Sequence, residues 1–142
     1  MATSIGAPTE GARSYSNALA LTGRVLLAAI FLLSGFGKVV QPGPMIAYIG
    51  AAGLPYPKLA LAGSALVELL GGAALVLGYR TRVAAIVLAL FSLVTALTFH
   101  SAFGDQNQFI HFFKNVAMAG GLLQVAAFGG GELSLDARLT RN

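Results

Sequence analysis

The sequence predicts an all-α integral membrane protein, a four-helix bundle whose two termini both lie in the cytoplasm. Of its 142 residues, 56% are hydrophobic and only 10% are charged, whereas soluble domains carry about a quarter charged residues. Four apolar stretches, at about 18–39, 59–78, 83–101 and 109–128, are each close to the roughly twenty residues with which an α-helix spans a bilayer. The short connections between them make successive helices antiparallel neighbours, as in a helix bundle.

The positions of the basic residues set the expected orientation. In the four-span arrangement, Lys38, Lys58 and Lys114 fall on one side of the membrane and all the arginines fall on the other. The arginines are Arg13, Arg24, Arg80, Arg82, Arg138 and Arg141. Because basic residues concentrate in cytoplasmic segments, we expect a multi-pass protein of the bacterial inner (cytoplasmic) membrane with N-in, C-in topology.

Composition also excludes several classes of function. The net charge of +4 does not indicate a nucleic-acid partner, since the basic residues are scattered singly beside apolar runs. Cysteine is absent from the chain, which excludes disulfides, thiolate nucleophiles and cysteine-bound zinc or iron–sulfur centres. The lipid bilayer is therefore the first partner to expect.

The N-terminal residues 1–17 are polar and rich in small residues, which predicts a disordered cytoplasmic tail. The span at 18–39 follows. A secretory signal peptide is the alternative, but the long tail and the place of Arg24 inside the apolar run favour an uncleaved helix. We expect Arg24 to reach the headgroups at the inner end of this helix and Lys38 to reach those at the outer end.

The segment between the first and second spans, 40–58, is predicted to hold a short interfacial helix. Pro44 can begin a helix, Gly53 can end it, and Pro55 prevents its continuation. A helix lying at the membrane surface could cap a cavity that the spans enclose. At the other end of the chain, the polar residues 129–142 predict a cytoplasmic tail.

The second span carries a single carboxylate, Glu68, near its middle. Ten residues separate it from Lys58, which places it about 15 Å deep. An ionised side chain at that depth costs several kcal/mol unless it is paired, hydrated or protonated. Gly71 and Gly72 beside it allow other helices to approach closely, so this span belongs inside the bundle. We therefore interpret Glu68 as a proton-exchanging or ligand-binding carboxylate, the catalytic candidate of the chain.

Further polar side chains gather at the outer ends of the predicted helices. These candidate ligand-binding residues are Lys38, His100, His111, Lys114 and Asn115. His111 shares a helix face with both Lys114 and Asn115, at spacings of three and four residues. Two interpretations stay open: a polar pocket with Glu68 at its floor, and a purely structural network in which Lys114 pairs with Asp105. Glu68 lies too deep to reach Lys114 directly unless the helices are offset or a water bridges them.

Three ligands can be weighed against these residues. Haem would need His100 and His111 to face one another inside the bundle, whereas both lie near one membrane surface. A divalent metal held by these histidines with Asp105 and Glu68 has suitable ligand types but no diagnostic spacing, so we assign no metal. A quinone needs a mainly apolar cavity with a few polar groups that exchange protons, which the sequence permits. The cofactor therefore stays unknown, with a quinone as a ligand that the sequence permits but does not demand.

Over about 24–124 the chain resembles the DoxX family of small bacterial inner-membrane proteins. The motifs that carry the resemblance are Arg24, Gly35-x-x-Lys38, Gly53-Leu54-Pro55, Glu68 with Gly71-Gly72, the stretch from His111 to Ala117, and Gly120-Gly121-Leu122-Leu123. The resemblance implies a four-helix bundle with both termini inside. It also implies a link to thiosulfate–quinone oxidoreduction or to membrane-bound oxidative-stress complexes, with partner subunits.

Three hypotheses of function follow. The first is a protein that is part of, or accessory to, a quinone-linked redox process, as a possible subunit of an oxidoreductase. The second is a non-catalytic membrane module that anchors or assembles a redox partner protein. The third is a small-solute transporter, which four helices could form only as a homo-oligomer or with partners.

Overall fold

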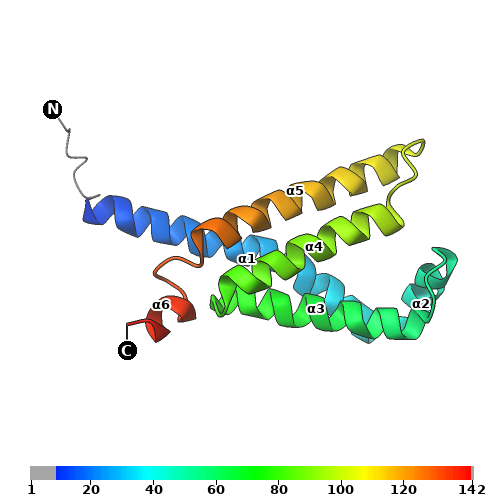
Figure 1. The fold of residues 1–142 in the computed structure, drawn as a ribbon, viewed down its shortest axis with the longest axis horizontal. Coiled ribbons are helices and arrows are strands. Elements are labelled where there is room, and N and C mark those ends of the chain that lie inside the picture. Colours follow the sequence, from blue (N-terminus) through cyan, green and yellow to red (C-terminus); the bar gives the residue numbers. More distant parts are fainter. Residues whose placement is uncertain (1–8, 142) are drawn as a thin grey trace.

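The computed structural model describes residues 9–141, and over that part the chain is all-helical. The described elements are α1 (Glu10–Val40), α2 (Pro42–Ala51), α3 (Pro57–Leu77), α4 (Thr81–Phe99), α5 (Gln106–Phe128) and α6 (Leu135–Leu139) (Figure 1). Three of them, α1, α3 and α4, are long and apolar enough to cross a membrane. The 23 residues of α5 are long enough, but polar residues such as His111, Lys114 and Asn115 lower its mean hydropathy.

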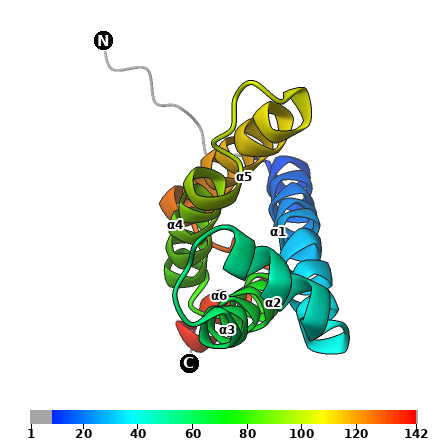
Figure 2. The same cartoon turned by 90° about the vertical axis from the view of Figure 1, so that its right-hand side faces the viewer.

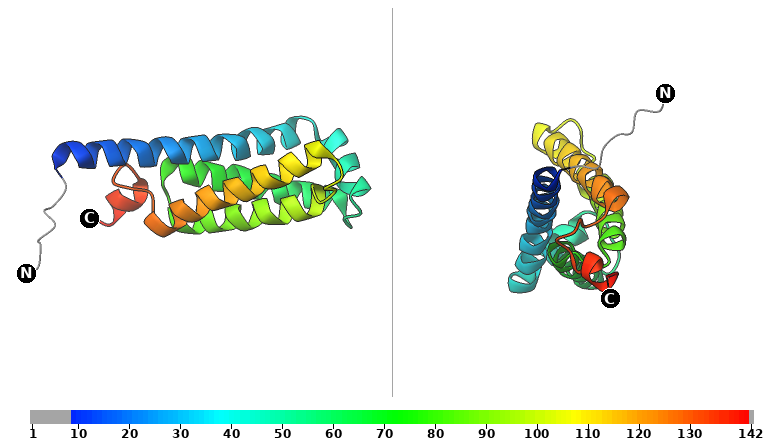
Figure 3. Two further views of the ribbon diagram at one scale, coloured as in Figure 1. Left: turned by 90° about the horizontal axis from the view of Figure 1, so that it is seen from above. Right: turned by 90° about the vertical axis from the view of Figure 1, so that its left-hand side faces the viewer.

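The four long helices pack as two antiparallel pairs. Helix α1 packs along α3 and α4 packs along α5, while α3 and α4 join the two pairs. The buried core lies between them and contains Ala28, Phe31, Leu75, Ala85, Leu88, Ala89, Ala119 and Leu122. Helix α6 lies at the same end of the molecule as the start of α1, and α2 lies at the opposite end (Figure 3).

The outer faces of the long helices are apolar as well. Leu26, Leu33, Leu70 and Leu97 come from three different helices and are between 64% and 70% exposed. A contiguous apolar exterior of this kind would be a liability in water and is the surface that lipid chains solvate. The prediction of an all-helical protein with membrane-spanning helices is therefore confirmed.

Helices α1 and α3 approach closely at Gly35. A Cβ atom there would lie 2.8 Å from Cγ of Leu69 and 3.2 Å from Cβ of Glu68, so only glycine fits without a shift. Gly35 lies five residues before the end of α1, whereas Glu68 lies eleven residues into α3. Because these positions are level, α3 extends beyond the end of α1 by about six residues, or roughly 9 Å.

The predicted N-terminal boundary is corrected by the structure. Residues 10–17, expected in a disordered tail, form the start of α1, since Thr9 caps the helix by accepting a hydrogen bond from the Ala12 N–H. Between Glu10 and Val40 there is no proline and no two adjacent glycines, so nothing interrupts the helix. The rest of the predicted tail, residues 1–8, lies outside the described residues.

The C-terminal segment, predicted only as a polar cytoplasmic tail, contains α6, which docks on the turn between α3 and α4. The carboxylate of Asp136 accepts hydrogen bonds from the backbone N–H groups of Arg80 (2.7 Å) and Thr81 (2.8 Å), where α4 begins. The Asp136 N–H donates to the Gly78 carbonyl at 2.9 Å. We call residues 129–141 the C-terminal clasp, because they cap one helix and hold the end of another.

Arg24 does not reach the headgroups, in contrast to the prediction. It is 1% exposed, and its guanidinium donates to the carbonyls of Leu75 (2.8 Å) and Leu133 (2.6 Å). The last carbonyls of a helix have no partner within it and carry the negative end of the helix dipole, which favours a cation there. A Cβ at Gly78, whose φ is +67°, would collide with this guanidinium and with Ser134, so the turn needs glycine.

We predict that Arg24→Ala lowers the free energy of unfolding by at least about 2 kcal/mol, because carbonyls bonded to a charged donor lose their partner inside the protein. The measurement is thermal unfolding of the purified protein in mild detergent. Arg13→Ala, which removes an exposed arginine from the same helix, is the matched control and leaves the midpoint unchanged. Equal midpoints for the two variants would contradict the role given to Arg24.

We predict that Asp136→Asn removes an acid-sensitive part of the stability. Partial burial acts to raise the pKa of Asp136, but hydrogen bonds from Thr81 and Arg80 and the charge of Arg24 outweigh it and lower the pKa below its ordinary value. The ionised cap therefore stabilises the fold above about pH 4 and is lost as the pH falls through the lowered pKa. The variant loses about 1 kcal/mol at neutral pH. Its difference from the wild type shrinks below about pH 3, and a constant difference across that range would disprove this account.

Candidate functional site

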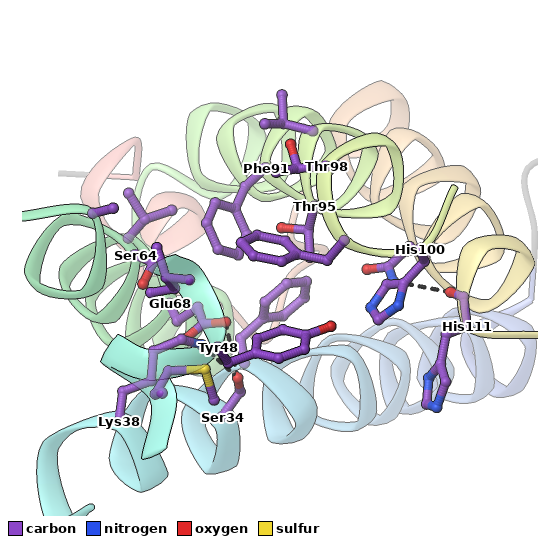
Figure 4. A pocket seen from close by; sticks show the side chains of 18 of the residues that line it. Ser34, Lys38, Tyr48, Ser64, Glu68, Phe91, Thr95, Thr98, His100 and His111 are labelled. Atoms are coloured by element: carbon purple, nitrogen blue, oxygen red, sulfur yellow. Dashed lines mark hydrogen bonds and ion pairs between the residues drawn. The ribbon is translucent and has the colours of Figure 1, made fainter. Parts of the chain in front are cut away.

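A cavity of about 710 Å³ lies at the end of the molecule that carries α2. Side chains from α1 to α5 line it, and most of its wall is apolar (Figure 4). The apolar lining includes Ile30, Phe31, Val67, Phe91, Val94, Phe99 and Met118. Its volume falls in the range of small-molecule sites, about 300–1,000 Å³.

Helix α2 contributes Met45, Tyr48 and Ile49 to this lining. Ile49 is buried, and the ring of Tyr48 stacks on Phe99 of α4 with 5.4 Å between the ring centroids. The short helix thus begins at Pro42 and reaches across the end of the cavity to α4. Figure 2, seen from this end, shows α2 in front of the start of α3.

Glu68 lies on the cavity wall in an ion pair. Its Oε2 lies 2.6 Å from Nζ of Lys38, and its Oε1 accepts a hydrogen bond from the Ser34 hydroxyl at 3.0 Å. Lys38 Nζ also donates to Ser34 Oγ at 2.8 Å, which closes a three-membered network. The side chains of Lys38 and Glu68 are only 10% and 5% exposed. Ser34 and Lys38 share one face of α1 because they are four residues apart.

The two histidines of the chain meet at the other side of the cavity. His100 follows the last turn of α4, and its ring stacks on that of His111 in α5 with centroids 5.1 Å apart. Nδ1 of His100 lies 2.8 Å from Oε1 of Gln108, which accepts a hydrogen bond when Nδ1 carries the proton. In a neutral ring the Nε2 atom of His100 is then an acceptor. His100 therefore belongs to the cavity lining and not to the lipid-facing surface.

Lys114 and Asn115 line the cavity from α5. The Asn115 amide donates to the His111 carbonyl one turn earlier, at 3.0 Å. Among residues 9–141 the ion pair of Lys38 with Glu68 stands alone, so Lys114 is not paired with Asp105. The Asp105 carboxylate instead caps α5 by accepting from the backbone N–H groups of Asn107 and Gln108.

The structure therefore brings all six sequence-predicted site residues to one cavity. The direct bond between Lys38 and Glu68 was missed, because the sequence placed one at the headgroups and the other near the midplane. The offset of α3 beyond the end of α1 reconciles the two depths. Within the part of the chain described here, no group of three histidine, aspartate or glutamate side chains is placed to hold a metal ion.

Comparison with known proteins agrees with this architecture. The DoxX family matches residues 19–101, and the SURF4 family matches residues 62–141. Inner membrane protein YqjF of Escherichia coli (strain K12) is 36% identical over 121 residues, which are 85% of this chain and 92% of that protein. Inner membrane protein YphA of the same organism is 34% identical over 125 residues, 84% of this chain and 89% of that protein.

No solved structure matches the chain. The identity with YqjF and YphA extends over nearly their whole length, and the family match covers the helices α1, α3 and α4 that can cross a membrane. The chain belongs to the DoxX family and is an inner membrane protein.

Proposed function

We propose that this protein binds a quinone in the cavity and is part of, or accessory to, a quinone-linked redox process. The observation that carries the proposal is a mainly apolar cavity of about 710 Å³ with a buried ion pair in its wall. Ligand sites for lipid-soluble molecules combine apolar walls with a few placed polar groups. An ionic network inside a membrane protein is expensive and is a functional hypothesis by default.

The proposed arrangement in the membrane is a four-helix bundle in which α5 is the fourth span. With 23 residues, α5 is about 35 Å long, and it packs antiparallel to α4. Both termini then face the cytoplasm, because the start of α1, the turn after α3 and the C-terminal clasp lie at one end and carry the arginines. Helix α2 lies at the outer interface, where it closes the end of the cavity.

The residues of the cavity divide the work of binding and proton exchange. A quinone supplies two carbonyl oxygens, which accept hydrogen bonds, and a ring that takes up electrons together with protons. The Lys38 ammonium and the Ser34 hydroxyl are donors, and both already contact Glu68. Glu68 can hold a proton or release it to a ligand oxygen bound at these donors. Phe31, Phe91 and Phe99 provide aromatic surface for a flat ring and exclude water.

A quinone-linked role also needs a protein that gives or takes the electrons. We place this centre in a redox partner protein, or in an assembly that contains a second copy of the chain. A non-catalytic module that anchors such a partner, and a transporter that works as a homo-oligomer, are the alternatives. The three proposals assign different roles to Glu68: binding a ligand and exchanging its proton, stabilising the anchor for a partner, or supporting the flux of a solute.

We predict that the protein purified in mild detergent carries nearly one equivalent of quinone, measured after organic extraction, and that Glu68→Gln loses most of it. Glu10→Gln, at the other end of α1, is the matched control and keeps its quinone. A folded wild type that carries no quinone even after quinone is added back would count heavily against the proposal. Flux of a small solute into vesicles that depends on Glu68 would favour transport. Loss of a co-purifying partner, with folding intact, would favour the anchor.

We predict that Lys38→Met destabilises the protein by about 3–5 kcal/mol, because it leaves Glu68 charged and unpaired inside the bundle. The double variant Lys38→Met with Glu68→Gln recovers much of this loss, since neither charge remains. The measurement is the unfolding midpoint of the single and double variants in the same detergent. If the double variant is no more stable than the single one, the ion pair is not what holds Lys38 in place.

A further inference from the structure

The charges in the cavity do not cancel. Lys38 and Glu68 neutralise each other, but Lys114 also lines the cavity and has no carboxylate partner. All five acidic residues of the chain lie within residues 9–141, so each can be accounted for. Besides Glu68, Asp105 caps α5 and Asp136 caps α4. Glu132 accepts from the Asn17 amide, and Glu10 begins α1 at the opposite end of the molecule.

The other polar side chains near Lys114 carry no negative charge. It lies eight residues into α5, about 12 Å from the start of that helix. The nearest polar side chains on its own helix are those of His111 and Asn115. The histidine that faces it from α4, His100, is stacked on His111, and neither ring carries a negative charge. Lys114 is exposed although it lines the cavity, so its ammonium is accessible to a ligand. No carboxylate of residues 9–141 pairs with it, so an anion supplied by that ligand would be its only anionic partner.

The cavity also has a side that faces the bilayer. Helices α1 and α5 pack against each other only sparsely, and they diverge toward the end where α2 lies (Figures 1 and 2). Ile30, Ser34 and Lys38 line the cavity from α1, and Lys114 and Met118 line it from α5. Ile30 is 48% exposed and Lys114 is exposed as well, so both edges of the cavity reach the outer surface of the bundle. A ligand with an apolar body can enter here from the lipid phase without crossing water.

We propose that the cavity selects an amphiphile with an anionic head, such as a carboxylate, which Lys114 binds while the apolar body lies along Phe31, Val67 and Phe91. Lys114 is thus the residue that sets specificity for charge. Hydrogen bonds between ionised groups are about twice as strong as neutral ones, so an acid should bind far better than its uncharged ester. The inference rests on the proposal that this cavity is a ligand site, but not on the ligand being a quinone.

The test uses the full chain in an uncharged detergent at about pH 8.5, where a fatty-acid carboxylate and a lysine are both charged. The probes are the fluorescent fatty acid cis-parinaric acid and its methyl ester, which differ in the charge of the head. We expect the wild type to bind the acid at least about tenfold more tightly than the ester. We expect Lys114→Met to lose this preference while its affinity for the ester stays within about twofold.

Two variants serve as controls. Lys114→Arg keeps the positive charge and should keep the preference for the acid. Lys58→Met removes a lysine of α3 that does not line the cavity, and should bind both probes as the wild type does. Unchanged binding of the ester shows that each variant is folded, so a loss of the preference reports on charge alone.

Equal affinity of the wild type for acid and ester would overturn the inference, and so would a preference that persists in Lys114→Met. Absence of binding of both probes to the wild type would overturn it as well. Each of these results leaves the quinone proposal to be judged by extraction of the purified protein. Conversely, the purified protein could carry no quinone and still prefer the acid through Lys114. That result would reject the quinone proposal and support this inference.

Discussion

A carboxylate inside an apolar bundle has to be neutralised where it lies, and the register of α1 on α3 depends on that requirement. Glu68 finds its cation in Lys38, at 2.6 Å, and Ser34 bonds to both. The close approach at Gly35 brings the two helices near enough for this contact. With that register fixed, α3 extends past the end of α1, and the chain between them must turn back over the gap. Helix α2 does so, and a cavity remains beneath it.

The two ends of the molecule are built in opposite ways. At the end with the C-terminal clasp, the free backbone groups of two helix termini are satisfied by side chains distant in sequence, those of Arg24 and Asp136. At the end with α2, the helices diverge and polar side chains face one another across a cavity. Rigidity at one end allows the helices to be held apart at the other without loss of the fold.

Much of this architecture could be predicted from the sequence, and the failures have a common cause. Composition and the lengths of the apolar runs predicted the helical membrane class, and proline and glycine positions predicted the short helix between the first two spans. Glu68 could be singled out because a carboxylate is rare in such a run. The surroundings of Arg24 and the partner of Glu68 could not be predicted, because both depend on the axial offset between helices. Hydropathy fixes which residues enter the membrane but leaves this offset open.

The helical start at residues 10–17 and the docking of residues 129–141 could not be predicted for a related reason. Residues 129–141 are polar and resemble a disordered segment, yet Asp136 and the Leu133 carbonyl bond to groups that only the folded bundle presents. A prediction based on local composition cannot detect hydrogen-bond partners that lie more than fifty residues away in the sequence. This limit does not apply to Asp105, whose role as a helix cap is local and involves the N–H groups two and three residues after it.

The C-terminal clasp has a consequence for the order in which the protein is made. The ribosome synthesises residues 129–141 after α1, α3 and α4. Until then Arg24 lacks the Leu133 carbonyl, and the first N–H groups of α4 lack the Asp136 carboxylate. The bundle can thus complete the end at which the clasp lies only after residues 129–141 have been synthesised, so a chain truncated before them would leave these helix termini unsatisfied.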